Sequence, residues 1–343
     1  MMCCPVATFG ESPSPRSFHA SVVIGDLLYV HGGVDKSNRV LASIHYFDVT
    51  TKTWSVVETV PSSHKCKVSG VLPDLDVCEA PSLSHHCALN YKDRFIMLIG
   101  GWNGKRRTSD VFLFDVCERR WNQMRIIGDI PVGLSSHTAS MVTEDEILIV
   151  GREGGVHTHR RSGDAFSLNP KTGEYKTAMY SIDSRSGHIS CMVSSSDKKK
   201  YRILIYSGRK TGNQYSFIGS WNTVYDKKNN VHQDISNRIT ALVQKSKRIE
   251  IPKGRQNSMH FCIDYKMVVI YGGQLWQARD SVSSDVIVFN TENNSWYVIE
   301  LDCSLPKLTG FTLNVGSDGQ CYIFGGNDGR SSNSSLWNLQ ARG

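Results

Sequence analysis

The sequence predicts an all-β fold, a β-propeller built from six copies of one four-stranded unit. The first observation is a short apolar run that ends at two glycines, such as FIMLIGG at residues 95–101. A run that is apolar throughout predicts a strand buried on both faces. The second observation is repetition at intervals of 51 to 68 residues, which suits one propeller blade per copy. The runs end at Gly33, Gly101, Arg152, Gly208, Gly273 and Gly326.

Each glycine pair lies between other elements that recur in the same order. The preceding strand usually carries a histidine, namely His19, His86, His137, His188 and His260, whereas the sixth copy has Gly310 and Phe311. A residue that recurs once per repeat is expected to serve the geometry of the repeat. A variable loop follows the glycines, and then a third strand at residues 44–48, 111–115, 165–168, 223–226 and 286–290. An aromatic residue then opens the fourth strand at Trp54, Trp121, Tyr175 and Trp296.

These motifs resemble those of the kelch family. In the first repeat the glycine pair ending at Gly33 precedes Phe47, Asp48 and Trp54, and repeats two and five keep the same order. The resemblance covers essentially the whole chain and implies a single six-bladed kelch propeller. The expected blades span about 18–58, 86–126, 137–180, 188–235, 258–301 and 309–340, the last one completed by residues 3–8.

The N-terminal segment is expected to close the last blade. Only 17 residues follow Gly326, enough for a third strand at residues 335–340 but not for a fourth. An open sheet edge invites aggregation, so another segment should cover it. Residues 3–8 precede the first blade and are therefore placed to supply the missing strand. Two long connections, residues 59–84 and 236–257, remain without an assigned role.

Composition limits the functional classes. The chain has 343 residues, 40% of them hydrophobic, so one sizeable core is available. No apolar run approaches the roughly 18 residues of a membrane helix, and the N-terminus lacks signal-peptide character. Ten cysteines without a CxxC pair favour reduced thiols. We therefore expect a monomer in the cytoplasm, and short basic runs such as residues 245–248 leave the nucleus open.

The loops after the second strands carry the charge of the chain. They comprise residues 34–42, 101–109, 152–163, 209–219, 273–283 and 326–334, with twelve basic and four acidic residues. Their net charge of +8 compares with +7 for the whole chain. Arginine side chains around a concave mouth offer paired donors to carboxylates or phosphates. The predicted partner-binding residues are Lys36, Arg39, Trp102, Arg106, Arg107, Arg152, Arg160, Arg161, Arg209, Lys210, Trp276, Arg279 and Arg330.

These features favour a protein-interaction module that binds an acidic or C-terminal carboxylate motif of a partner protein. Loop charges that are merely solvated are the competing interpretation, and nucleic acid is disfavoured because no nucleic-acid motif is present. A substrate receptor of a ubiquitin ligase and a metal-dependent oxidoreductase remain as alternatives. His157 and His159 beside Glu153 could bind a metal. No nucleotide-binding glycine loop, GxSxG or HExxH motif occurs, so we expect neither cofactor nor enzymatic activity.

Overall fold

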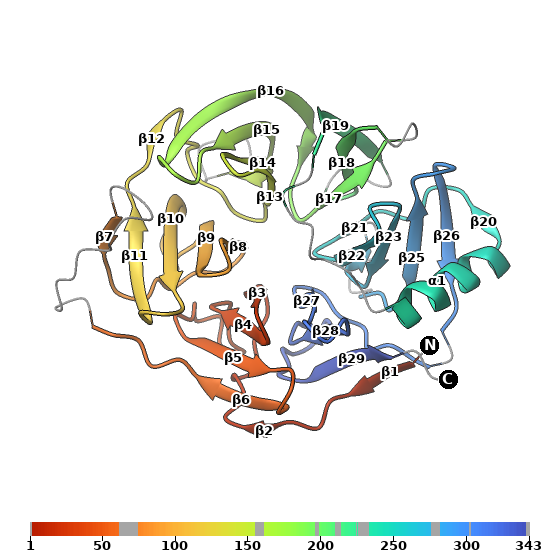
Figure 1. Cartoon of the computed structure of the whole chain (residues 1–343), viewed down its shortest axis with the longest axis horizontal. Coiled ribbons are helices and arrows are strands. Elements are labelled where there is room, and N and C mark those ends of the chain that lie inside the picture. Colours follow the sequence, from red (N-terminus) through yellow and green to blue (C-terminus); the bar gives the residue numbers. More distant parts are fainter. Residues whose placement is uncertain are drawn as a thin grey trace.

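Six β-sheets surround a central axis in the computed structural model (Figure 1). The structure describes residues 2–61, 75–154, 161–195, 199–209, 214–223, 225, 233–275, 282–301 and 303–340. Blades are numbered 1 to 6 in chain order, and each begins with an inner strand beside the axis. The all-β, six-bladed propeller expected from the sequence is confirmed.

The first three blades share a meander of four antiparallel strands. Each inner strand pairs with the apolar second strand that ends at the glycine position. The strands of blade 1 are β3 (Ala20–Ile24), β4 (Leu27–His31), β5 (Ile44–Asp48) and β6 (Thr53–Val56). Those of blade 2 are β8 (Cys87–Tyr91), β9 (Phe95–Trp102), β10 (Arg107–Asp115) and β11 (Arg120–Met124). Those of blade 3 are β13 (Thr138–Thr143), β14 (Glu146–Glu153), β15 (Arg161–Leu168) and β16 (Glu174–Arg185).

The other three blades depart from this plan to different degrees. Blade 4 has β17 (Ile189–Ser194), β18 (Tyr201–Tyr206) and β19 (Tyr215–Trp221). Blade 5 has β22 (Met259–Ile263), β23 (Met267–Tyr271), β25 (Val286–Asn290) and β26 (Ser295–Ile299), with a small ribbon of β21 (Arg255–Gln256) and β24 (Gln274–Leu275). Blade 6 has β27 (Thr312–Val315), β28 (Cys321–Phe324), β29 (Leu336–Gln340) and β1 (Met2–Pro5).

The expectation of four strands in every blade is wrong. In four blades the segment that leads into the blade from the preceding one pairs with the fourth strand and adds a short fifth strand. Two of these pair parallel to their neighbour and two pair antiparallel. They are β2 (Phe9–Gly10), β7 (Leu75–Val77), β12 (Ile127–Gly128) and β20 (Arg248–Ile249). Part of the two long connections is therefore sheet, because β7 and β20 lie within them.

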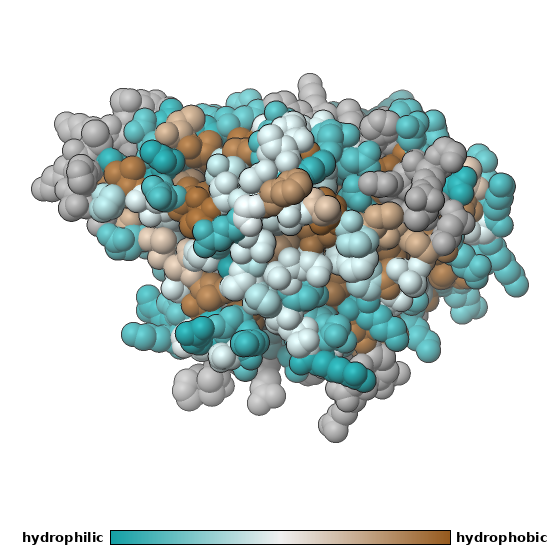
Figure 2. Space-filling view, turned by 90° about the horizontal axis from the view of Figure 1, so that it is seen from below, coloured by the Kyte–Doolittle hydropathy of each residue, from teal (hydrophilic) through white to brown (hydrophobic). Residues whose placement is uncertain are grey.

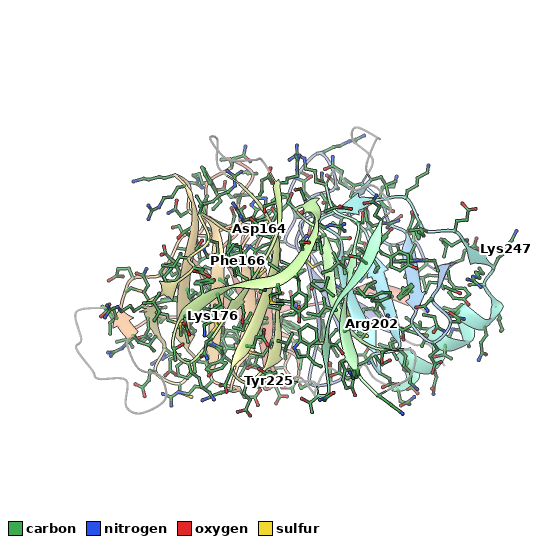
Figure 3. All side chains as sticks on the ribbon, turned by 90° about the horizontal axis from the view of Figure 1, so that it is seen from above. Asp164, Phe166, Lys176, Arg202, Tyr225 and Lys247 are labelled. Carbon is green, nitrogen blue, oxygen red and sulfur yellow. The ribbon has the colours of Figure 1, made fainter. Side chains whose placement is uncertain are left out.

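Blade 4 also overturns the third strand expected at residues 223–226. The third strand is β19, whose Tyr215 pairs with Tyr206 and whose Phe217 pairs with Leu204. The preceding loop consequently ends at residue 214, before the expected limit of residue 219. Within the described residues this blade has three strands, and the long β16 extends from blade 3 toward its outer side (Figures 1 and 3).

The N-terminal strand completes blade 6. β1 pairs antiparallel with β29, placing Cys3 opposite Leu339 and Pro5 opposite Trp337. The two ends of the chain therefore lie side by side at the outer edge of the ring (Figure 1). Cys3 is buried, and its backbone N–H donates to Cys303 Sγ at 2.9 Å. Closure by residues of the N-terminal segment agrees with the expectation from the sequence.

The core consists of six buried clusters, one between each pair of neighbouring blades. The aromatic residues that open the fourth strands contribute by reaching the preceding blade. The Trp54 ring lies 5.0 Å from Phe324 of blade 6. The Trp296 ring lies 4.6 Å from Tyr206 of blade 4. Blade-to-blade packing therefore supplies most of the hydrophobic stabilisation.

One helix, which the sequence analysis did not anticipate, covers the outside of blade 5. α1 (Gln233–Lys245) lies in the connection interpreted as a long loop. Ile235, Ile239 and Val243 are buried at helical spacing and join the cluster between blades 5 and 6. No helix among the described residues is long and apolar enough to cross a membrane. On the wall that carries β2, β6, β1 and β29, hydrophilic and hydrophobic side chains are interspersed (Figure 2).

Removal of residues 2–8 is expected to lower the melting temperature by several degrees, because it strips blade 6 of its outer strand and exposes the cluster that contains Cys3. Thermal unfolding followed by circular dichroism measures the change. Cys4→Ser is the control, because Cys4 is only partly buried in the same strand. An unchanged melting curve after the deletion would refute the closing role of β1.

Candidate partner-binding face

Six backbone hydrogen bonds form a closed ring around the central axis. In each blade the residue just before the inner-strand histidine, or its counterpart, donates its N–H to the matching carbonyl of the preceding blade, at 2.7 to 3.2 Å. All six residues have positive φ, between 51° and 62°. We call this set the mouth ring; its members are Phe18, His85, Ser136, Gly187, Asn257 and Gly310. The face that carries it, where the second strands end, is the mouth face.

The glycine pairs exist because two blades meet at them. A Cβ on the first glycine would strike the next blade: on Gly100 it would lie 2.6 Å from Leu134 Cβ and 3.0 Å from His137 Cε1. A Cβ on the second would strike the inner strand of its own blade: on Gly101 it would lie 2.8 Å from His86 Cβ. The histidines thus serve blade packing, as expected, and a glycine with positive φ is required at these positions.

The expectation that His260 of blade 5 is equivalent to the recurrent histidines of blades 1 to 4 is wrong. The second glycine of blade 5, Gly273, faces Ser258, so Ser258 occupies the position that a histidine holds in blades 1 to 4. This substitution explains the loss of a glycine in blade 4. Ser207 holds the first position there with φ of 57°, and its hydroxyl is bonded to the backbone of Arg255. A small neighbour leaves room for the Ser207 side chain.

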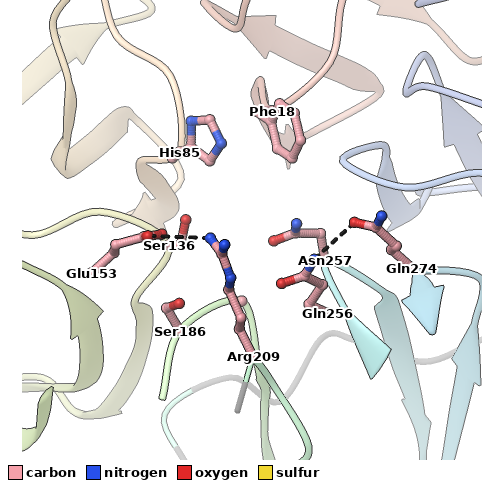
Figure 4. A pocket seen from close by; sticks show the side chains of 10 residues that line it. Phe18, His85, Ser136, Glu153, Ser186, Arg209, Gln256, Asn257 and Gln274 are labelled. Carbon is pink, nitrogen blue, oxygen red and sulfur yellow. Dashed lines mark hydrogen bonds and ion pairs between the residues drawn. The ribbon is translucent and has the colours of Figure 1, made fainter. Parts of the chain in front are cut away.

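A cavity of about 220 Å³ opens beside the mouth ring. Its wall combines mouth-ring residues with residues that directly follow the glycine positions, so the loops after the second strands and the segments before the inner strands contribute to one site. Arg209 Nη1 lies 3.4 Å from Glu153 Oε1, and Gln256 Nε2 donates to Gln274 Oε1 at 2.8 Å (Figure 4). The lining residues are Phe18, His85, Ser136, Glu153, Ser186, Gly187, Arg209, Gln256, Asn257 and Gln274.

Several polar groups of this cavity are available to a ligand. The Asn257 amide and the Ser136 and Ser186 hydroxyls project toward it without a hydrogen bond to any described residue (Figure 4). On the opposite wall the Phe18 and His85 rings stack with centroids 4.1 Å apart. Burial lowers the pKa of His85 to about 4, so this imidazole is neutral at pH 7. The cavity therefore offers neutral donors and acceptors beside one guanidinium and the Glu153 carboxylate that contacts it.

The structure distributes the predicted binding residues around the mouth face. Among the described members of the set, Arg209 is the one that lines the cavity. Lys36, Arg106 and Arg330 are exposed on the loops of blades 1, 2 and 6. The Arg107 guanidinium lies 5.7 Å from the Trp102 ring centroid, a cation–π contact within blade 2. Arg161 is a further described member, whereas Arg160, Lys210, Trp276 and Arg279 lie outside the described residues.

Some of the predicted cations form ion pairs within the molecule. Arg39 Nε lies 2.8 Å from Asp35 Oδ2, and Arg152 Nη2 lies 3.4 Å from Asp164 Oδ2. Together with the contact between Arg209 and Glu153, three predicted cations have a carboxylate partner. The sequence could not show the pair of Arg209 and Glu153, because these residues stand 56 positions apart.

Sequence reasoning missed the mouth ring itself. A signal was present, because each ring residue precedes the recurrent histidine or its counterpart in a four-residue pattern such as RSFH at residues 16–19 or LSSH at residues 134–137. His157 and His159 lie outside the described residues. Within the described chain no group of three His, Cys, Asp or Glu residues is arranged to hold a metal.

Comparison with known sequences agrees with this geometry. Residues 6–208 match the family model described as the KLHDC2/KLHL20/DRC7 Kelch-repeats domain. The chain belongs to the kelch-repeat family. The human kelch domain-containing protein 9 is 28% identical over 267 residues, which cover 74% of this chain and 75% of that protein. The mouse protein of the same name is equally similar, at 28% over 268 residues.

The kelch region also resembles parts of larger proteins. The Arabidopsis thaliana serine/threonine-protein phosphatase BSL2 is 28% identical over 145 residues, 42% of this chain but 13% of that protein. The unusual sequence GREGG at residues 151–155 pointed to kelch domain-containing protein 9, and the comparison confirms that likeness. Kelch propellers typically serve as protein-interaction modules.

Ser258→His is expected to destabilise this kelch propeller by about 1–3 kcal/mol, because the imidazole would meet the Ser207 side chain. Adding Ser207→Gly should restore part of the loss, since it recreates the glycine–histidine contact of the other blades. A double-mutant cycle in urea measures the coupling. Strict additivity of the two changes would contradict the proposed contact.

Buried histidines should make the kelch propeller acid-sensitive. Burial lowers the pKa of His137 from 6.5 to about 4, so below pH 6.5 the unfolded chain takes up a proton that the folded chain refuses. Stability contributed by the neutral ring is therefore complete above pH 6.5 and is lost as the pH falls toward 4. Seven other histidines show lowered pKa values, namely His19, His31, His45, His85, His86, His188 and His260.

His137→Phe tests this dependence, because Phe311 already occupies the matching position in blade 6 and neither ring nitrogen of His137 has a hydrogen-bond partner. Between pH 6.5 and 4 the unfolding free energy should fall less steeply, by up to about 1.4 kcal/mol per pH unit. Phe311→His is the reciprocal control and should steepen the decline. Denaturant titrations at several pH values give both slopes; equal slopes would disprove the assignment.

Proposed function

We propose that this chain is a non-catalytic protein-interaction module that binds a segment of a partner protein on its mouth face. The cavity beside the mouth ring carries the proposal. It is concave, lies on a rigid ring of backbone hydrogen bonds, and presents donors from Asn257, Ser136, Ser186 and Arg209. Binding sites of proteins are commonly formed by loops that a rigid scaffold holds in place.

The chemistry of the face favours a carboxylate-bearing segment. Arg209 is 45% exposed, and its contact with Glu153 is long, so a ligand carboxylate can compete for the guanidinium. Lys36, Arg106 and Arg330 surround the mouth with exposed positive charge that would attract an acidic partner over a distance of about 10 Å. A C-terminal carboxylate or an acidic side chain both satisfy this arrangement.

We further propose that the chain works as a monomer in the cytoplasm or nucleus. All nine cysteines among the described residues are free thiols, and some of them are buried. Free thiols are usual in reducing compartments, where disulfides rarely persist.

Charge reversal of the mouth face tests the proposal. Lys36, Arg106, Arg209 and Arg330 are each changed to Glu, and quantitative affinity capture should then lose the partners that the original chain retains. The loss should be greatest at low salt, where electrostatic attraction is strongest.

A matched control reverses four cations on the opposite face. Lys92, Arg119, Lys200 and Lys266 lie in the turns at the far ends of the strands, so their change to Glu alters the net charge equally. This variant should keep its partners. Retention of every partner by the mouth-face variant, with an unchanged circular dichroism spectrum, would refute the proposed site.

A further inference from the structure

Three buried arginines hold the mouth face from beneath. Arg16, Arg185 and Arg255 are at most 2% exposed, and each stands three residues before an inner-strand histidine or its counterpart. Each donates from Nη1 to a carbonyl at the first glycine position of the blade whose inner strand follows it: Gly32 at 3.1 Å, Ser207 at 3.1 Å and Gly272 at 3.2 Å.

Two of these guanidinium groups have an aspartate nearby. Arg185 Nη2 lies 3.9 Å from Asp183 Oδ2, and Arg255 Nη2 lies 3.7 Å from Asp285 Oδ2. The aspartates occupy two different positions of the repeat. Asp183 stands two residues before its arginine, whereas the Asp285 carbonyl accepts the N–H of Gly272 across the second and third strands of its blade.

Blade 1 has serine at both of these positions. Ser14 matches Asp183, because its carbonyl accepts from Arg16 Nε at 3.0 Å just as the Asp183 carbonyl accepts from Arg185 at 3.1 Å. Ser43 matches Asp285, because its carbonyl accepts the N–H of Gly32 at 3.1 Å.

Arg16 is therefore a buried cation whose hydrogen-bond partners among the described residues are all neutral. Arg16 Nη2 donates to the hydroxyls of Ser14 and Ser43, each at 3.2 Å. No carboxylate of the described residues lies within ion-pair distance of it. Burial alone lowers the pKa of Arg16 to about 10, whereas Asp183 partly offsets the effect of burial on the pKa of Arg185. Among the described residues, no anion lies beside Arg16 as Asp183 and Asp285 lie beside Arg185 and Arg255.

Ser14 and Ser43 are both exposed, but of the two only Ser14 is followed by a proline. It is exposed within the sequence SPSP at residues 12–15, where two prolines exclude regular hydrogen bonding. Neither Ser12 nor Ser14 donates its backbone N–H to a described residue. The contacts of Ser14 with Arg16 are thus what an enzyme would have to displace to reach the hydroxyl.

We propose that Ser14 is a phosphorylation site for a proline-directed serine kinase and that Arg16 holds the resulting phosphate where blade 4 has Asp183. Ser14 Oγ forms a bond to the γ-phosphorus of ATP, the bond from that phosphorus to the β,γ-bridging oxygen breaks, and ADP leaves. The hydroxyl proton passes to the catalytic base of the kinase. The phosphate then accepts hydrogen bonds from Arg16 Nη2 as a dianion.

The phosphate would strengthen the seam between the first and last blades. The Arg16 N–H donates to the Asn333 carbonyl at 3.1 Å, and the Arg16 carbonyl accepts the N–H of Gly326 at 2.9 Å. Its side chain meanwhile holds Gly32 of blade 1. A charge-assisted contact on the guanidinium therefore fixes a residue that joins both ends of the ring.

The test incubates the folded, full chain with a proline-directed serine/threonine kinase and ATP, and maps phosphate by mass spectrometry. The variant Ser12→Ala leaves Ser14 as the serine of this segment that can be phosphorylated, and Ser14→Ala leaves Ser12. The two singly phosphorylated products therefore carry equal charge. Phosphate on Ser14 should raise the melting temperature by about 2 °C, whereas phosphate on Ser12 should not raise it. Ser14→Asp and Ser12→Asp should differ in the same direction.

Two results would overturn the proposal. One is the absence of phosphate on Ser14 of the folded protein while a peptide of residues 8–20 is modified. The other is a shift for phosphorylated Ser14 no greater than that for phosphorylated Ser12. In the reciprocal variant Asp183→Ser, Arg185 loses its nearby carboxylate and the melting temperature should fall; an unchanged value would likewise count against the role given to the anion.

Discussion

The closed ring of six backbone hydrogen bonds is the constraint on which the rest of the structure depends. Each mouth-ring residue donates to the preceding blade and accepts from the next, so displacing one blade breaks two bonds at once. Such a chain of aligned amides strengthens each member by polarisation. The backbone can reach this geometry only with positive φ, which costs a residue such as Phe18 roughly 1–2 kcal/mol. The histidine, the mouth-ring residue before it and the glycine pair therefore depend on one another and form a single structural unit.

Because of this arrangement, the side chains that meet between neighbouring blades must have complementary sizes. Where blade 6 presents Phe311, blade 5 keeps Gly272; where blade 5 presents only Ser258, blade 4 can carry Ser207. The backbone contacts stay constant while the side chains vary. The carbonyls of Arg16, Leu83, Leu134, Arg255 and Leu308 all accept the N–H of the second glycine position of the preceding blade. Arginine and leucine can thus exchange at this position without altering the frame.

Much of the fold was readable because its signals are local. Apolar strands before glycine pairs and the aromatic residues Trp54 and Trp121 identify the blades, and the short C-terminal repeat required a closing strand. The third strand of blade 4 was predicted at the wrong residues because the sequence pair Tyr225 and Asp226 resembles the pair that ends the third strand in other repeats. The third strand that the structure shows contains Gly219. The helical spacing of Ile235, Ile239 and Val243 was present in the sequence, but three apolar residues among polar ones are a weak signal for a helix within a connection.

The site was less predictable than the fold because its properties arise between blades. Loop charge could be counted, yet pairs such as Arg209 with Glu153 form only when two loops meet. The same holds beneath the surface, where the charge on Arg16 becomes informative only by comparison with Arg185 and Arg255 in equivalent positions. In a repeat fold the frame makes such positions equivalent, so a residue that differs from its counterparts exposes what one blade lacks. The exceptions to the repeat, more than its consensus, therefore carry the functional information of this chain.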